Sequence, residues 1–327
     1  TSKTSFVINN AIFDGNITNG TSGDGGAIEF YTGSTSTINS TIFRNNKAGS
    51  AASYELGRNG GASKGNGSAT ITFNNCIFHD NYARGWGAAH TNWMDSGGSS
   101  TFENCTFEGN VYYGSGGSTY SRYGSLTIRN SIVWNTLYDG NQAGYDIYDY
   151  GSLITATNII HGGSNHGVTF SGTNSTSNPS FTDASSNDYT LQSTSPAIGA
   201  GNTDATATDF NGITRPQGTN DDIGAYEYRN TWTGSTDTDW GTTGNWDQSY
   251  EPNANTESPI IADVTNQPVI SSDDGSSNDG NVLLEDITIN SGAELTINKD
   301  ASLKLVGDFT NNGTVTLNSA ADEFASI

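Results

Sequence analysis

The octapeptides NNCIFHDN at residues 74–81 and ENCTFEGN at residues 103–110 share one phrase, an Asn-Cys-x-Phe run with an Asn three residues later. The phrase returns as NNAIFDGN at 9–16 and NSTIFRNN at 39–46, and a weaker copy, RNSIVWNT, occupies 129–136. Successive copies are about 26 to 35 residues apart, which is a spacing typical of solenoids, propellers and repeat arrays. The sequence therefore predicts a repeated structural unit.

Each repeat also contains a short segment in which apolar and polar residues alternate, such as ATITF at 69–73 and SLTIR at 125–129. Alternation with a period of two predicts β-strands, and strands this short are stable only when they pair with neighbours. Stacked repeats would pair every strand with its copy and bury one continuous apolar column.

Two positions that are mostly Asn flank the aromatic position: Asn10, Ser40, Asn75, Asn104 and Asn130 stand three residues before it, and Asn16, Asn46, Asn81 and Asn110 three residues after it. The residues three before it are predicted to form a left-handed bend, because Asn tolerates that backbone conformation. The residues three after it are predicted to form a hydrogen-bonded column. The aromatic position itself is predicted to form an internal stack of Phe13, Phe43, Phe78, Phe107, Val133 and Ile160.

These repeats resemble right-handed parallel β-helix proteins, and the resemblance covers residues 1–175. It implies an all-β fold in which the insertions at 48–68 and 82–98 are loops on one flank. Cys76 and Cys105 occupy the same repeat position, so they are expected to be neighbours. They would form either a small-residue ladder or a disulfide between adjacent coils.

Residues 176–229 contain SPAIGAGN (195–202), DFNGITRPQ (209–217) and DDIGAYEY (221–228), and they resemble the terminal segment of bacterial surface β-helix proteins. The expected role of this segment is to cap the open end of the β-helix, where strand edges would otherwise be exposed. Arg215 is expected to pair with Asp209, Asp222 or Glu227.

Residues 230–327 form a third pattern. Trp232, Trp240 and Trp246 are interpreted as the core of a small domain or, alternatively, as a glycan site. Apolar pairs then recur eight residues apart, as in Ile287/Ile289 and Leu295/Ile297, which predicts a tighter and incomplete β-solenoid or roll. This region resembles modules of large proteins that Bacteroidetes export by type IX secretion, which implies an extracellular or cell-surface location and the secretion machinery as a partner.

The chain carries 34 acidic and 12 basic side chains, for a net charge of −22. This charge argues against nucleic-acid binding, and no stretch approaches the roughly 18 apolar residues of a membrane span. The chain is expected to be a fragment of a longer protein. Acidic loops suit Ca²⁺, and Asp273, Asp274 and Asp279 in SSDDGSSNDGN (271–281) are weak candidate ligands, with a solvated turn as the alternative.

The candidate binding surface is aromatic. If the repeats are in register, several insertions and strands place their rings on one flank, where flat rings can stack on sugars; the expected carbohydrate-binding residues are Trp86, Trp93, Tyr120, Tyr123, Tyr145 and Tyr148. The alternative is that these rings only cover the side of the helix.

The leading functional hypothesis is a non-catalytic, adhesin-like protein that binds a polysaccharide or cell-surface glycan, with no catalytic residues and no cofactor other than Ca²⁺. A polysaccharide lyase or glycosidase is the alternative, and Arg84, His90 and Asp146 would then be the residues to test. A purely structural stalk is a third hypothesis. Fold alone does not choose among them.

Overall fold

The structure is a computed structural model that describes residues 5–18, 24–49, 58–94, 97–114, 116–140, 142–151, 153–203, 206–272, 280–318 and 327. The chain forms two compact units. The first consists of Thr1–Gly212 and Asn220–Tyr226, and the second of Ile213–Thr219 and Glu227–Ile327.

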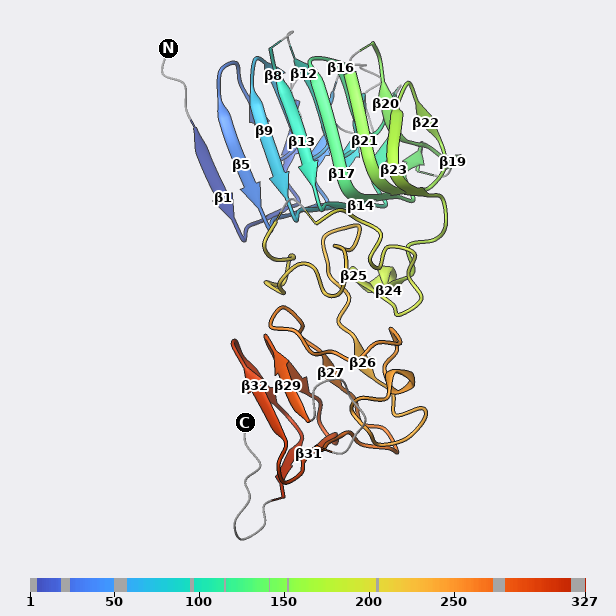
Figure 1. Ribbon diagram of the computed structural model, residues 1–327. Coiled ribbons are helices and arrows are strands. Elements are labelled where there is room, and N and C mark those ends of the chain that lie inside the picture. The colour runs from blue at the N-terminus through green and yellow to red at the C-terminus, as the bar shows by residue number, and fades with distance from the viewer. Residues whose placement is uncertain are drawn as a thin grey trace. The chain divides into compact units, whose positions relative to one another are not determined.

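The first unit is a parallel β-helix, as predicted, whose coils contribute strands to three stacked sheets (Figure 1). One sheet bends sharply, so that it forms two faces. The strands of its first face are β1 (Phe6–Asn9), β5 (Thr35–Asn39), β9 (Thr70–Asn74), β13 (Ser99–Glu103), β17 (Ser125–Trp134), β21 (Leu153–His161) and β23 (Thr169–Ser175). Its second face consists of β2 (Ile12–Asp14), β6 (Ile42–Arg44), β10 (Ile77–His79) and β14 (Thr106–Glu108), and β17 and β21 continue into it.

The other two sheets complete each coil. The second sheet contains β3 (Ile17–Thr18), β7 (Lys47–Ala48), β11 (Tyr82–Ala83), β15 (Val111–Tyr112), β18 (Leu137–Tyr138) and β19 (Gln142–Ala143). The third contains β4 (Ile28–Phe30), β8 (Ser63–Gly67), β12 (His90–Met94), β16 (Gly117–Tyr123), β20 (Tyr145–Asp149) and β22 (Asn165–His166). The pairing within these sheets is parallel except between β18 and β19.

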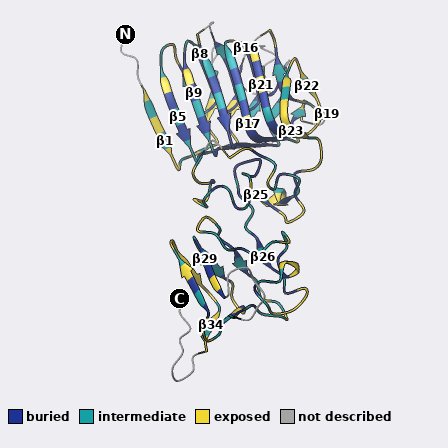
Figure 2. Cartoon of the chain, in the orientation of Figure 1, coloured by how far each residue is buried: buried dark blue, intermediate teal, exposed yellow. Residues whose placement is uncertain are grey.

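The aromatic position of the repeat forms the predicted internal stack. Phe13, Phe43, Phe78 and Phe107 pair in register, and their ring centroids are 4.7 to 4.9 Å apart with nearly parallel planes. Val133 continues this column, but its partner in the next coil is His161 rather than the expected Ile160. The prediction for the sixth coil was therefore wrong by one residue. In Figure 2, buried residues alternate with less buried ones along strands of the first face such as β9 and β17.

The Asn positions behave as the sequence predicted. The Asn16, Asn46, Asn81 and Asn110 amides form a column, in which each Nδ2 donates to the Oδ1 of the next residue at 2.9 to 3.0 Å. The positions three before the aromatic residue all have left-handed backbone, with φ between 44° and 54°; they are Asn10, Ser40, Asn75, Asn104, Asn130 and Asn158. A polar or Gly residue turns each coil sharply, because few other residues adopt this conformation without strain.

The sequence analysis expected the segment at 176–229 to cap the end of the β-helix, and several of its residues in the first unit, between 201 and 225, contact the side of the coils. Asn75 donates to the Thr208 carbonyl, Asn104 to the Thr206 hydroxyl and Asn130 to the Asn202 carbonyl, at 2.7 to 3.0 Å. These three Asn residues come from three successive coils, so the segment runs along one corner. The last strand, β23, is largely exposed instead of covered. After β23 the chain forms a hairpin of β24 (Phe181–Asp183) and β25 (Asp188–Leu191), with the short helix η1 (Ala184–Ser186) between them.

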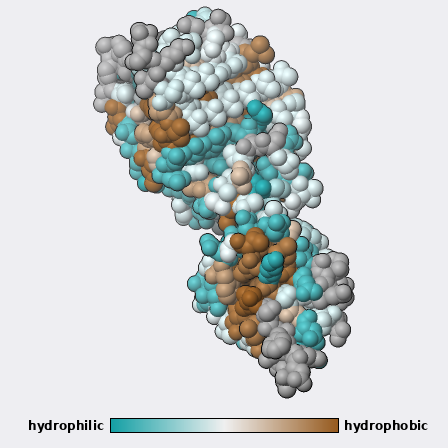
Figure 3. Space-filling view, turned by 60° about the vertical axis from the view of Figure 1, so that its left-hand side comes forward, coloured by the Kyte–Doolittle hydropathy of each residue, from teal (hydrophilic) through white to brown (hydrophobic). Residues whose placement is uncertain are grey.

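The second unit is a smaller set of parallel sheets. One sheet contains β26 (Thr231–Trp232), β27 (Ile260–Ile261), β30 (Ile287–Ile289) and β33 (Phe309–Asn311). A second contains β28 (Val269–Ile270), β31 (Glu294–Ile297) and β34 (Thr314–Leu317), and a third pairs β29 (Asn281–Leu284) with β32 (Ser302–Leu305). The short helix η2 spans Thr243–Asn245. Strands in adjacent short coils pair with each other; for example, Ile287 pairs with Phe309 and Leu295 pairs with Val315. Val306, Phe309 and Leu317 are exposed, and Figure 3 shows hydrophobic surface gathered on one side of this unit.

The three Trp residues of this unit form its core, and not a surface site. Trp232, Trp240 and Trp246 are each at most 2% exposed, and the Trp246 ring lies 4.7 Å from Trp240 and 5.1 Å from Trp232. Each indole N–H donates to a backbone carbonyl. Of the two interpretations that the sequence allowed, the structure supports the core, because buried rings offer no face to a sugar.

Two further sequence expectations are resolved by contacts within a unit. The buried Arg215 guanidinium pairs with Glu227, one of its three expected partners. Cys76 and Cys105 are both free, and neither has exposed surface. Their Sγ–H groups donate to backbone carbonyls, so the cysteines occupy a small-residue ladder in the core.

Candidate binding surface

The outward face of the third sheet presents aromatic side chains from successive coils. Alternation along a strand directs every second side chain outward. Met94 and Ile147 belong to the apolar core, so the adjacent Trp93 and Tyr148 point away from it. The register of β16 with β20 pairs Tyr120 with Tyr148, which places these two rings side by side.

These rings form a continuous stack, here called the aromatic row, that runs across four coils. Neighbouring centroids are separated by 5.3 Å (Trp93–Trp86), 5.3 Å (Trp86–Tyr120), 5.8 Å (Tyr120–Tyr148) and 4.4 Å (Tyr148–His166), with interplanar angles of 10° to 19°. The ring faces therefore cover one another, and Tyr120 is only 1% exposed.

The predicted binding residues consequently fall into two groups. Trp86, Trp93, Tyr120 and Tyr148 are brought together in the aromatic row, where their faces are largely occupied. Tyr123 and Tyr145 lie beside it and are exposed. Rings that already stack on each other provide edges to a ligand, whereas the exposed tyrosines provide faces.

Arg122 lies at one end of the aromatic row. Its guanidinium carbon is 4.3 Å from the Trp93 centroid, 5.2 Å from that of Tyr123 and 5.7 Å from that of Tyr150. The pairing of β12 with β16 shifts here, since Asn92 pairs with Ser121 but Trp93 pairs with Tyr123. Arg122 is thus the extra residue of a β-bulge, a feature that re-aims a side chain.

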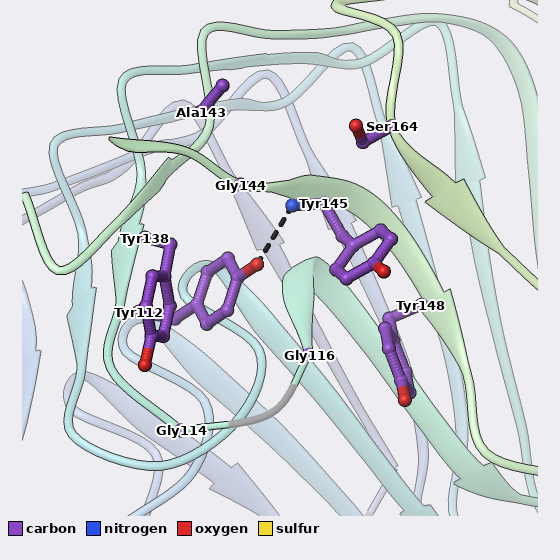
Figure 4. Close-up of a pocket in the computed structure, with 9 residues that line it drawn as sticks. All are labelled: Tyr112, Gly114, Gly116, Tyr138, Ala143, Gly144, Tyr145, Tyr148 and Ser164. Carbon is purple, nitrogen blue, oxygen red and sulfur yellow. Dashed lines mark hydrogen bonds between the residues drawn. The ribbon is translucent and has the colours of Figure 1, made fainter. Parts of the chain in front are cut away.

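A pocket of about 390 Å³, here called the tyrosine pocket, opens beside the other end of the row (Figure 4). The described residues that line it carry no charge; they are Tyr112, Gly114, Gly116, Tyr138, Ala143, Gly144, Tyr145, Tyr148 and Ser164. The Tyr145 and Tyr148 rings meet edge to face at 5.2 Å, and Tyr112 and Tyr138 are 5.5 Å apart.

One hydrogen bond joins two sheets of the β-helix at this pocket. The backbone N–H of Tyr145 donates to the Tyr112 hydroxyl at 2.8 Å, which ties the second sheet to the third (Figure 4). Burial raises the pKa of Tyr112, so its hydroxyl stays protonated at neutral pH. Gly144 contacts the Tyr112 ring so closely that a Cβ there would lie 2.7 Å from it. The pocket thus combines neutral hydroxyls with apolar ring surface, which suits a ligand rich in hydroxyl and C–H groups.

A smaller pocket of about 220 Å³ shares Ala143, Gly144 and Ser164 with the tyrosine pocket and contains Asp146. Burial raises the pKa of Asp146 to about 7, although backbone N–H groups oppose this shift. One of them, the Gly162 N–H, donates to Oδ2 at 2.5 Å. Asp146 is therefore a neighbour of the tyrosine pocket that titrates near neutral pH.

The other residues considered for catalysis are placed differently. His90 lies inside the coil, where Nδ1 contacts the Ser63 hydroxyl at 2.9 Å and Nε2 the Ser100 hydroxyl at 3.0 Å. Burial lowers its pKa to about 3, so it is neutral and inaccessible to a polymer. Arg84 lies over the Tyr113 ring at 4.9 Å. These residues do not converge on one point with Asp146.

No group of three or more His, Cys, Asp or Glu side chains that would suit a metal ion occurs in the described parts of the chain. Asp273, Asp274 and Asp279, the weak Ca²⁺ candidates, lie outside the described residues. No helix within the described ranges is long and apolar enough to cross a membrane.

Tyr112 and Tyr138 line the pocket but are not among the six carbohydrate-binding residues expected from the sequence. The two residues pair in register between β15 and β18, and they reach the pocket from the second sheet. The available signal was their identical position, five residues after the aromatic position of consecutive repeats. The antiparallel return of β19 against β18 brings Ala143 and Gly144 to the same pocket.

The comparisons with known proteins concern mainly the second unit. Residues 231–322 match a family model described as a domain of unknown function, DUF8693. No curated protein and no solved structure matches the chain.

Proposed function

We propose that this protein is a non-catalytic, adhesin-like β-helix that binds a polysaccharide or cell-surface glycan in the tyrosine pocket and along the adjoining aromatic row. The observation that carries the proposal is the uncharged lining of the pocket, with four tyrosines and three glycines among its described residues. Aromatic faces pack against the C–H faces of sugar rings, while phenol and backbone groups exchange hydrogen bonds with their hydroxyls.

The proposal extends to location and export. The resemblance of the repeats and of the C-terminal module to secreted Bacteroidetes proteins supports an extracellular or cell-surface site of action and delivery by their secretion machinery. The strongly acidic composition, with a net charge of −22, is compatible with that setting and disfavours nucleic acid as the ligand.

A glycosidase or lyase remains the second candidate because of one observation, the position of Asp146 in the neighbouring pocket with a pKa near 7. An acid with that pKa is suited to general acid–base catalysis. Glycosidases, however, usually need two carboxyl groups across the scissile bond. The described residues that line this pocket include no other carboxyl group, which favours binding over cleavage.

The test is a binding screen of the intact chain on an array of plant, algal and bacterial glycans, followed by calorimetry on the strongest binder. Tyr138→Ala and Tyr145→Ala each remove a half-exposed ring of the pocket, and each should weaken binding about 10-fold. Tyr31→Ala is the matched control, since Tyr31 is exposed but does not line the pocket.

Three outcomes separate the hypotheses. Loss of affinity in the two pocket variants but not in Tyr31→Ala supports the proposal. Absence of binding to every glycan supports a structural stalk instead. New reducing ends or unsaturated products from a bound polymer, abolished by Asp146→Asn, would establish an enzyme.

A further inference from the structure

We infer that the glycan recognised by this surface carries an anionic group, a carboxylate or a sulfate ester, and that Arg122 binds it. This inference rests on the proposed function and deepens it, because it names the chemical class of the ligand and a second contact point beyond the tyrosine pocket.

The first observation is the unpaired charge of Arg122. Three other basic side chains of the first unit have acidic partners: Arg44 pairs with Asp14, Lys64 with Asp24 and Arg129 with Glu103. Among the described residues, Arg122 has only its aromatic contacts. The positive charge of Arg122 is thus not neutralised by a carboxylate of the described residues, although acidic residues outnumber basic ones by 34 to 12 in the chain.

The second observation is an unsatisfied donor. The Arg122 Nε is buried and has no hydrogen-bond acceptor. A buried polar group without a partner is costly, so a ligand that supplies an acceptor to this donor would gain binding energy. A negatively charged acceptor would satisfy this donor and also pair with the positive charge, and such a charge-assisted bond is stronger than a bond to a neutral acceptor.

The third observation is the way the side chain is presented. The β-bulge of β16 places both Arg122 and Tyr123 opposite Trp93, so the guanidinium sits among the rings of Trp93, Tyr123 and Tyr150. A guanidinium that stacks on rings keeps the donors in its plane available for a two-pronged contact with a carboxylate or sulfate. The surrounding rings also restrict its conformations before any ligand arrives.

The fourth observation is the distance to the tyrosine pocket. Arg122 is two residues from Tyr120 on β16, which corresponds to about 7 Å along the strand. Tyr120 is paired in register with Tyr148, which lines the pocket. A short oligosaccharide that occupies the pocket would therefore place an acidic substituent of a neighbouring sugar at Arg122.

The test uses matched pairs of glycans that differ in charge alone. The intact chain is titrated with oligogalacturonate and its methyl ester, and with a sulfated galactan oligosaccharide and its desulfated form, alongside the full array. We expect at least one anionic member to bind about 10-fold or more tightly than its neutral counterpart. Its affinity should fall as salt rises. The two pairs distinguish a carboxylate from a sulfate.

Variants assign the preference to Arg122. Arg122→Gln should abolish the difference between charged and neutral members, and Arg122→Lys should retain part of it because the charge remains but the planar fork is lost. Arg44→Gln removes the same charge from the same unit at a position outside the aromatic row and the tyrosine pocket, and this variant should keep the full preference for the charged glycan. Circular dichroism and thermal unfolding check that each variant is folded.

The outcomes distinguish this inference from the proposed function. Equal affinity for both members of each bound pair, or a preference that survives in folded Arg122→Gln, overturns the inference and leaves the tyrosine pocket as the site of a neutral glycan. Binding to no glycan at all overturns the proposed function and this inference together.

Discussion

The buried Asn column offers the sharpest test of what holds the coils in register. The Asn81 side chain has four hydrogen bonds of 2.8 to 3.1 Å: its Nδ2 donates to the Asn110 Oδ1 and the Phe43 carbonyl, and its Oδ1 accepts from the backbone N–H and the Nδ2 of Asn46. All of these groups are shielded from water. Asn81→Ala removes the four bonds and leaves the Asn46 N–H and the Phe43 carbonyl without these partners.

The expected cost follows from those contacts. Four hydrogen bonds at a net contribution of about 0.5–1.5 kcal/mol each give a loss of about 4 kcal/mol in the free energy of unfolding. Two buried groups left without partners, at about 1–3 kcal/mol each, lead to the same value of about 4 kcal/mol. With a denaturant slope of about 5 kcal/mol/M in guanidinium chloride, the unfolding midpoint should fall by about 0.8 M. Far-UV circular dichroism during equilibrium denaturation measures this midpoint.

The matched control is Asn39, the central residue of a second Asn ladder on the outer face of the first sheet. Asn39 donates to Asn9 at 2.8 Å and accepts from Asn74 at 2.9 Å, but water can replace both bonds. Asn39→Ala should therefore cost less than about 1 kcal/mol. A midpoint for Asn81→Ala within 0.2 M of that for Asn39→Ala, at an unchanged slope, would refute the argument that burial makes the inner column essential.

Three further outcomes are expected. Burial raises the pKa of Asp146 to about 7 in the folded chain, against about 3.9 in the unfolded chain, so the folded state binds more protons between these pH values. The free energy of unfolding should therefore fall by up to about 4 kcal/mol as the pH rises from about 4 through 7. Asp146→Asn should remove that loss. If the melting temperatures of variant and wild type change with pH in the same way across this range, the prediction is wrong. Cys76 and Cys105 have no exposed surface, and burial raises the pKa of the Cys105 thiol, so a thiol reagent should label both only after unfolding; labelling of the native protein within minutes would count against this arrangement. Trp240→Ala should cost about 3–5 kcal/mol of unfolding free energy, because it empties the centre of the second unit, and a calorimetric trace identical to wild type would be inconsistent with that core.

Much of the β-helix could be predicted because its contacts repeat in sequence. Phe43 stacks on the equivalent Phe of the coils before and after it, and Asn81 bonds its equivalents in the same way. In a solenoid each coil mainly contacts its neighbours, so a residue's spatial partner is its copy one repeat away. A pattern in the sequence is then directly a pattern in space.

The candidate site was predictable only as a set of aromatic residues on one flank. Stacking in the aromatic row depends on the direction of each side chain and on the shape of the loop at 84–89 that carries Trp86, and a repeat pattern specifies neither. The β-bulge that contains Arg122 arises from one extra residue in β16 relative to β12. Such an irregularity becomes visible only when two strands are paired.

The contacts of the segment that follows the repeats could not be predicted for a related reason. Thr208 and Thr206 accept hydrogen bonds from Asn75 and Asn104 across more than 100 positions of sequence, and nothing in a local pattern specifies which surface so distant a segment will contact. The sequence by itself determined the coil, its Phe and Asn columns and the polar bends, because these interactions join identical positions of adjacent repeats. Only the tertiary structure decided where the lateral segment lies, which rings cover one another and which enclose a pocket, because those contacts join unlike positions whose approach depends on loop length and side-chain direction.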